Sequence, residues 1–138
     1  MRRLTGLLLV LCISACAQEP PRAAIEGEVT LAIGQPLPTG TIRFLPLDGA
    51  AGAIAFAEIS EGKYRLASTK GPALGKNRVE ITALRKSGEK IPVPDGPPGQ
   101  FQEVDEQYLP ARFNINSTIT VEIIPGQNKK DFRLDELH

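Results

Sequence analysis

The sequence contains few of the side chains on which enzymes and metal sites most often depend. It has no tryptophan and one histidine, His138, and its two cysteines, Cys12 and Cys16, both lie near the N-terminus. Nucleophilic sites of the Ser-His-Asp or Cys-His type need a histidine held within the fold, and zinc sites need several histidines or cysteines together. The composition therefore predicts a protein that is not an enzyme and that has no cofactor and no metal site.

The sequence also lacks an apolar stretch long enough to span a membrane. A transmembrane helix needs about 20 consecutive apolar residues, and the stretch 4–15 is shorter. Arg2 and Arg3 precede this stretch and small residues end it, which is the arrangement of a signal peptide. Its end, Ile13-Ser14-Ala15-Cys16, resembles a bacterial lipobox, in which the chain is cut before the cysteine and the thiol receives lipid. We expect a lipoprotein signal peptide over 1–15 and lipidation of Cys16.

An ordinary secretory signal, cut after Ala15, is the alternative, and it would leave Cys16 as a free thiol. Under the lipoprotein interpretation the mature chain has no thiol left for a disulfide. Removal of 1–15 takes away two of the 16 basic residues and none of the 16 acidic ones, so the net charge becomes −2. Because this balance gives no basic patch, nucleic acid is not an expected partner.

The lipid would make the membrane a partner through Cys16 and place the protein in the bacterial cell envelope. Ala17 follows the cysteine, where an aspartate would retain some lipoproteins at the inner membrane, so outer-membrane residence is favoured. Residues 16–24 include Pro20-Pro21, which favours an extended conformation. This segment is expected to be a tether, and 25–138 is expected to form one domain.

The mature sequence has short apolar runs and frequent turn residues, and no stretch with a helical period. Glycine and proline, 13 and 12 in number over the full sequence, divide it at short intervals. Alternating or continuous apolar runs predict seven strands, at 25–33, 39–45, 53–59, 64–68, 76–84, 119–123 and 130–134. The strand at 53–59 is expected to be buried on both faces or filled with small residues, and the last two strands to form a hairpin. Seven short strands predict an all-β sandwich.

The segment 85–107 is predicted to be a long loop. It holds four prolines, three glycines and many charges, and it greatly exceeds the usual connection of about 4–6 residues. Loops of this length are often functional.

Three segments, in this order, resemble carboxypeptidase-regulatory-like domains of bacterial surface lipoproteins. They are Gly27-Glu28-Val29-Thr30 through Thr41-Ile42-Arg43-Phe44, then Ser60-Glu61-Gly62-Lys63-Tyr64-Arg65-Leu66, then Leu109-Pro110-Ala111-Arg112-Phe113-Asn114 through Gly126-Gln127-Asn128. The resemblance implies a seven-stranded transthyretin-like, or prealbumin-like, β-sandwich. It implies no activity, because most members of that family have no known function.

Two groups of residues near the long loop are candidate ligand sites. Glu103, Asp105 and Glu106 could together hold calcium, although a solvated acidic loop is the simpler interpretation. Phe101, Tyr108 and Phe113 could stack on sugar rings, although Tyr108 and Phe113 are better explained as core residues at the entry of strands. Other carboxylates, Glu58, Glu80 and Glu122, fall on the outward faces of predicted strands and are expected to be solvated, which leaves no carboxylate pair for catalysis.

The sequence thus predicts a membrane-anchored, non-catalytic envelope lipoprotein whose β-sandwich has a structural or protein-interaction role. The alternative is a module that binds a small ligand, glycan or calcium, through 85–107. The expected partners, besides the membrane, are envelope proteins or polysaccharide.

Overall fold

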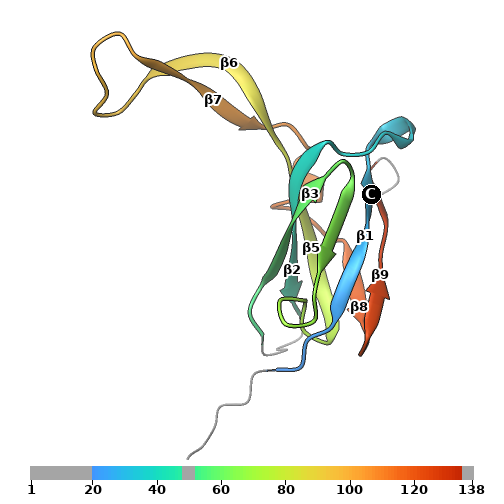
Figure 1. The fold of residues 1–138 in the computed structure, drawn as a ribbon. Helices are drawn as coiled ribbons and strands as arrows, with labels where there is room; N and C mark the ends of the chain where they lie inside the picture. Colours follow the sequence, from blue (N-terminus) through green and yellow to red (C-terminus); the bar gives the residue numbers. More distant parts are fainter. Residues whose placement is uncertain (1–19, 48–51, 135–138) are drawn as a thin grey trace, which may run out of the picture.

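Most of the chain forms β-strands that wrap around one core (Figure 1). The computed structural model describes residues 20–47 and 52–134; the predicted signal peptide, Cys16 and His138 lie outside them. The strands are β1 (Ala24–Thr30), β2 (Thr39–Pro46), β3 (Ala55–Ser60), β4 (Lys63–Leu66), β5 (Gly75–Thr82), β6 (Leu84–Pro92), β7 (Phe101–Gln107), β8 (Thr120–Ile123), β9 (Gln127–Lys129) and β10 (Phe132–Arg133). Two short 3-10 helices, η1 (Ala32–Gly34) and η2 (Ala111–Phe113), interrupt them. The all-β class is therefore confirmed.

The main sheet follows the order β10-β1-β4-β3-β2-β5-β8, and β9 also pairs with β1. Its pairs are antiparallel except for β9 and β10, which both run parallel to β1. β8 ends this order on one side, and the short turn 124–126 joins it to β9, which pairs with β1 near the other end. The sheet therefore folds back on itself and encloses its apolar face, as in a barrel or sandwich.

The core is made by the inward-facing residues of these strands. On β3, Ala55, Ala57 and Ile59 are buried while Phe56 and Glu58 point outward. The inward face of β3 thus carries mostly small residues, which was one of the two expectations for this strand. The other expectation, burial on both faces, is wrong. The largest fully buried side chains of the core include Phe44, Ile25, Leu37, Ile42, Ile81 and Ile123.

The expected C-terminal hairpin is wrong. β8 pairs with β5, whereas β9 and β10 cross to β1. Asn128 holds this crossing: its Nδ2 donates to the carbonyls of Ala24 and Ile124, at 3.1 and 2.9 Å, and its Oδ1 accepts from the Ile124 amide at 3.1 Å. A buried side-chain amide therefore supplies the hydrogen bonds that a hairpin ladder would have made.

The strand predicted at 130–134 is shorter: only Phe132–Arg133 form β10, which keeps the register of β9 on β1, and the ladder is interrupted at 130–131. The buried Tyr64 hydroxyl donates to the Lys130 carbonyl at 2.6 Å, and the Lys130 amide donates to Glu26 at 3.0 Å. A Cβ on Gly27 would lie 1.8 Å from the Lys130 oxygen, so only glycine fits in β1 here.

The folded domain begins before residue 25, so the tether predicted over 16–24 is too long. Ala23 and Ala24 are buried, the Ala23 amide donates to Pro72 at 3.1 Å, and the Leu74 amide donates to Pro21 at 3.1 Å. Backbone pairing with the loop after β4 thus incorporates these residues. The first strand also ends sooner than predicted, since the chain turns into η1 after Leu31.

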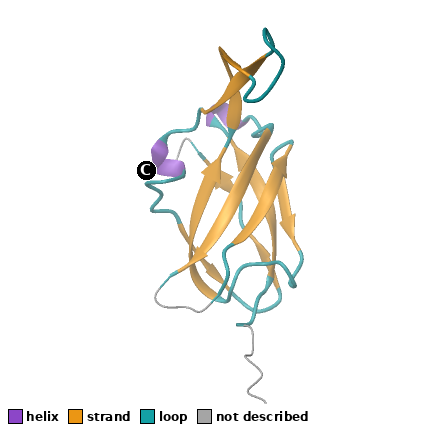
Figure 2. Cartoon of the chain, turned by 90° about the vertical axis from the view of Figure 1, so that its left-hand side faces the viewer, coloured by secondary structure: helices purple, strands orange, loops and turns teal. Residues whose placement is uncertain are grey.

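The segment 85–107 is not a loop but most of an antiparallel hairpin, formed by β6 and β7. The hairpin projects from one end of the body, and the described chain enters at the opposite end (Figures 1 and 2). Within residues 20–47 and 52–134, no helix is long and apolar enough to cross a bilayer.

Candidate interaction surface

The β6–β7 hairpin stands apart from the core. Its strands form a separate two-stranded sheet, and none of residues 84–107 is buried. A two-stranded hairpin alone in water is only marginally stable. Its order must therefore come from its own cross-strand contacts and from the way its base is held.

Opposite charges hold the part of the hairpin near the body. Arg85 Nε lies 2.7 Å from Glu106 Oε1, and Lys86 Nζ lies 2.8 Å from Asp105 Oδ1. The hydrogen bond and charge of Asp105 raise the pKa of Lys86. These pairs are exposed, so solvent screens them and they add little to the stability of the fold. Their main effect is to fix which residues of β6 and β7 face each other.

The middle of the hairpin carries a bulge, between Lys86 and Lys90. There the Gly88 amide donates to Glu103 Oε1 at 2.9 Å and the Glu89 amide donates to Ser87 Oγ at 3.1 Å. Bulges, charges and prolines on an edge strand oppose pairing with another strand. The two long edges of this hairpin are therefore poor templates for sheet extension.

The base of the hairpin is clamped to the body by backbone and side-chain hydrogen bonds. Gln107 Oε1 accepts from the amides of Ala83 at 2.9 Å and Leu109 at 3.2 Å, and the Tyr108 amide donates to Ala83 at 3.2 Å. The Arg85 guanidinium lies 5.6 Å from the centre of the Tyr108 ring. These contacts fix the hairpin where it leaves the core.

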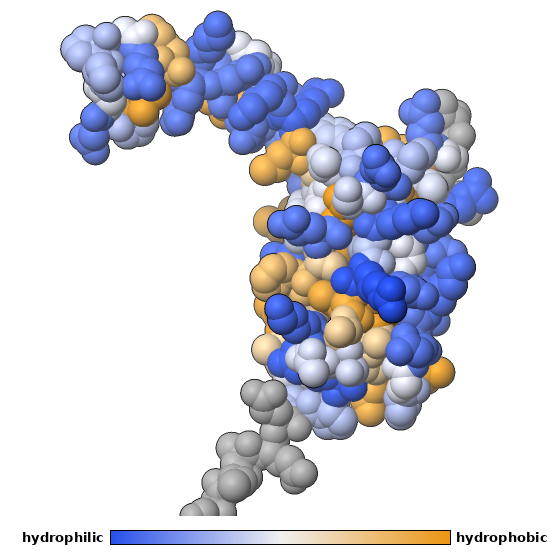
Figure 3. All heavy atoms as spheres, viewed as in Figure 1, coloured by the Kyte–Doolittle hydropathy of each residue, from blue (hydrophilic) through white to orange (hydrophobic). Residues whose placement is uncertain are grey.

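The tip of the hairpin, residues 91–101, is apolar and ordered by a compact turn. Phe101 is 58% exposed and Ile91 37% exposed, and they flank a turn that holds four prolines. The Val93 amide donates to Gln100 at 3.0 Å and the Gly96 amide to Val93 at 3.0 Å. The space-filling view shows a small apolar patch at this end of the hairpin, among pale and hydrophilic residues, beyond the polar shaft (Figure 3).

The three aromatic residues predicted near this segment do not form one surface. Phe101 lies at the tip, Tyr108 at the base and Phe113 in the core, 2% exposed. At about 3.4 Å per strand residue, Phe101 lies about 24 Å along the hairpin from Tyr108. The core interpretation thus holds for Phe113, and Tyr108 packs against the core half-buried.

The three acidic residues are likewise used within the hairpin. Glu106 and Asp105 pair with Arg85 and Lys86, and Glu103 accepts from a backbone amide. Among residues 20–47 and 52–134, no group of three or more histidine, cysteine or acidic side chains is placed to hold a metal ion. The geometry thus does not favour the calcium interpretation.

The glutamates on the outer faces of the strands divide into two kinds. Glu58 and Glu122 are exposed, as expected. Glu80 is only 7% exposed, so its predicted solvation is wrong. Its carboxylate lies 3.2 Å from Arg43 Nη1 and 2.7 Å from Arg78 Nη2, and the two guanidinium groups cover it.

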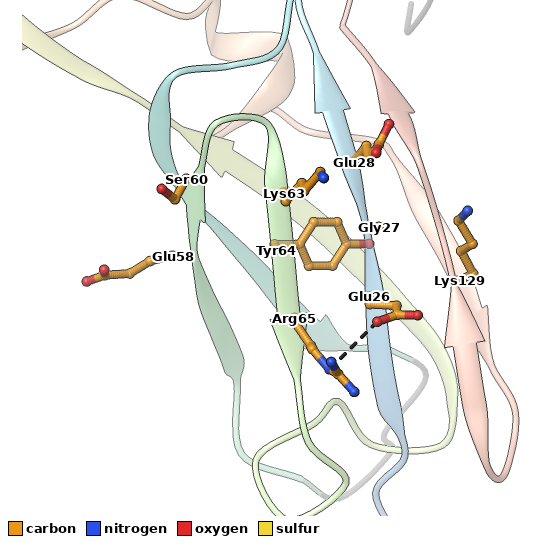
Figure 4. A pocket seen from close by; sticks show the side chains of 9 residues that line it. All are labelled: Glu26, Gly27, Glu28, Glu58, Ser60, Lys63, Tyr64, Arg65 and Lys129. Carbon is orange, nitrogen blue, oxygen red and sulfur yellow. Dashed lines mark ion pairs between the residues drawn. The ribbon is translucent and has the colours of Figure 1, made fainter.

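A shallow polar hollow lies over β1, β3 and β4, with a volume of about 490 Å³ (Figure 4). Its lining mixes acidic and basic side chains, and Arg65 and Glu26 pair across it at 3.6 Å. Tyr64 lies at its floor, where burial, and to a smaller degree the charge of Asp131, raises the pKa of its phenol. The phenol therefore stays protonated and donates to Lys130, which is a structural role.

No protein-family model, curated protein or solved structure matches this chain. The resemblance to carboxypeptidase-regulatory-like domains therefore stays a prediction, and the site must be interpreted from its own residues.

Proposed function

We propose that this chain is a non-catalytic bacterial envelope lipoprotein that presents the β6–β7 hairpin to a partner protein. Cys16 would carry the lipid, and a short tether would join it to the domain, which we propose to be a transthyretin-like sandwich of the kind that the sequence resembles. The outer membrane is the favoured site because Ala17 follows the cysteine.

This proposal rests mainly on the exposed apolar side chains at the hairpin tip and on the hydrogen bonds that hold the hairpin in place. An extended ribbon with no buried residue adds little to the stability of the domain, whereas its base, its bulge and its tip are each held by specific hydrogen bonds. Exposed aromatic side chains on a rigid support are the usual anchors of protein interfaces. Phe101 supplies such an anchor next to the turn of the hairpin, and Ile91 adds apolar surface on the other strand.

The direction of the hairpin supports the same proposal. The described chain enters at one end of the body and the hairpin leaves at the other (Figure 1). A lipid on Cys16 would hold the first end at the membrane, and the tip would point away from it. The partner would then be a protein, or a part of one, that lies beyond the domain.

In-cell crosslinking tests the proposal. A photoreactive phenylalanine analogue replaces Phe101, and the matched control replaces Ile115, which is 77% exposed and lies outside the hairpin. We expect a discrete protein adduct from position 101 and none from position 115. Adducts from position 115 alone, or equally from both positions, would contradict a function of the tip.

A further inference from the structure

A second apolar surface lies on the outer face of β3, at the end of the body where the chain enters. Phe56 is 65% exposed and Ile54 is 44% exposed. They line a hollow of about 640 Å³ together with Arg22, so this surface adjoins the first described residues. Figure 3 shows apolar surface on this part of the face, next to strongly hydrophilic side chains.

The rim of this hollow is basic. Arg22, Arg65 and Lys70 line it, against one carboxylate, that of Glu58. Arg65 is 81% exposed in its side chain, and its contact with Glu26, at 3.6 Å, leaves it accessible. Apolar side chains beside several cations fit the interface of a membrane that contains anionic lipid.

The sequence distance from Cys16 limits how far this surface can lie from a lipid on that residue. Arg22 follows Cys16 by six residues, and a fully extended chain spans at most about 3.6 Å per residue. The basic rim therefore begins within about 22 Å of the anchor, whatever conformation the intervening residues adopt.

We infer that the surface formed by Ile54, Phe56, Arg22, Arg65 and Lys70 docks onto the anionic headgroups of the membrane that holds the lipid. This inference rests on the proposed lipid anchor at Cys16. The two apolar side chains enter the interface and Arg65 and Lys70 contact lipid phosphates. Arg22 donates to the Gly71 carbonyl at 3.3 Å and adds its charge to the rim. The domain then lies against the bilayer at a fixed angle and does not swing on its tether.

The absence of native tryptophan makes a direct test possible. Phe56→Trp places one reporter in the hollow, and Ile54→Trp is a second reporter should the first disturb the fold. Ile115→Trp is the control. Each full-length lipidated chain is reconstituted in phosphatidylcholine vesicles, with and without phosphatidylglycerol, that contain lipids brominated near the headgroup.

We expect bromine to quench the reporters at 56 and 54, but not at 115, in the anionic vesicles. Arg65→Gln and Lys70→Gln should each lower the docked-to-undocked ratio about fivefold, since one basic side chain near an anionic surface contributes about that factor. Raising the ionic strength from about 0.1 to about 1 M, which shortens the Debye length from about 10 to about 3 Å, should release the surface while the anchor persists.

Vesicle flotation distinguishes a failure of the docking inference from a failure of the proposed lipid anchor. A chain that floats with the vesicles while its reporters at 56 and 54 remain unquenched overturns the docking and leaves the anchor intact. A chain that does not float overturns the anchor, and the docking with it. Quenching that is equal at 56 and 115 also overturns the docking, because it would show contact without a preferred face.

Discussion

Shortening the β6–β7 hairpin should leave the stability of the domain almost unchanged. The change joins Lys86 to Asp105 through Asn-Gly in place of residues 87–104. These two residues are register partners with side chains 2.8 Å apart, so a two-residue turn can close the remaining ladder without strain.

The expected magnitude follows from burial. None of the removed residues is buried, and none belongs to the core cluster. The hydrogen bonds that are lost are exposed to solvent. Folding also no longer pays the conformational entropy cost of ordering the removed residues. We therefore expect the free energy of unfolding to change by less than about 1 kcal/mol, within the range of surface substitutions.

Urea unfolding of the soluble chain 18–138, followed by circular dichroism, measures this difference. The intact and shortened chains should have nearly the same free energy of unfolding in water. The shortened chain should have a slightly lower slope, because less surface becomes exposed, and therefore a slightly higher midpoint. A loss of more than about 2 kcal/mol would refute the reasoning, since it would show that the hairpin covers the body and is not a separate element.

Three further predictions use the same assay. Gly27→Ala should cost about 3 kcal/mol, as severe overpacking does, because its Cβ would lie 1.8 Å from the Lys130 oxygen; an unchanged midpoint would contradict the close approach. Phe113→Ala should cost about 3–5 kcal/mol and Phe101→Ala less than about 0.5 kcal/mol; similar losses would refute their separation into core and tip. Because the folded state raises the pKa of Tyr64, the unfolded phenol ionises first, and stability should fall above about pH 10 by up to 1.4 kcal/mol per pH unit. Tyr64→Phe should lower stability by about 1 kcal/mol at neutral pH and weaken that decline, and an equally steep decline would contradict the assignment to Tyr64.

Strands that bury one face could be predicted from the sequence. The alternation in 76–84 gave β5, and Val79, Ile81 and Ala83 are buried as the pattern indicates. The pairing of the C-terminal strands could not be predicted in this way. It depends on the buried Asn128 and on the contact between Tyr64 and Lys130, which join residues far apart in the sequence.

The hairpin was missed because neither of its faces is buried, so it carries no apolar alternation. A different signal was present. The residues before the proline-rich turn include Arg85, Lys86 and Lys90, and those after it include Glu103, Asp105 and Glu106. Opposite charges that face each other across a turn are typical of an exposed antiparallel pair.

The separation of the three candidate aromatic residues was missed for a related reason. Nearness in the sequence places Phe101 and Tyr108 together only in a loop, whereas an extended strand sets them at opposite ends of the hairpin. The prediction of a lipid anchor does not depend on the fold, since it rests on the sequence of residues 1–16 alone.

The intact mass of the protein purified from membranes, with a fragment mass for its N-terminal peptide, tests the lipid anchor most directly. Both the proposed function and the docking surface depend on that anchor. The account predicts a chain that starts at Cys16 and carries diacylglycerol on the thiol, and it predicts that Cys16→Ala releases the protein from the membrane fraction. A chain that retains residues 1–15, or that begins at Cys16 with a free thiol, would contradict it.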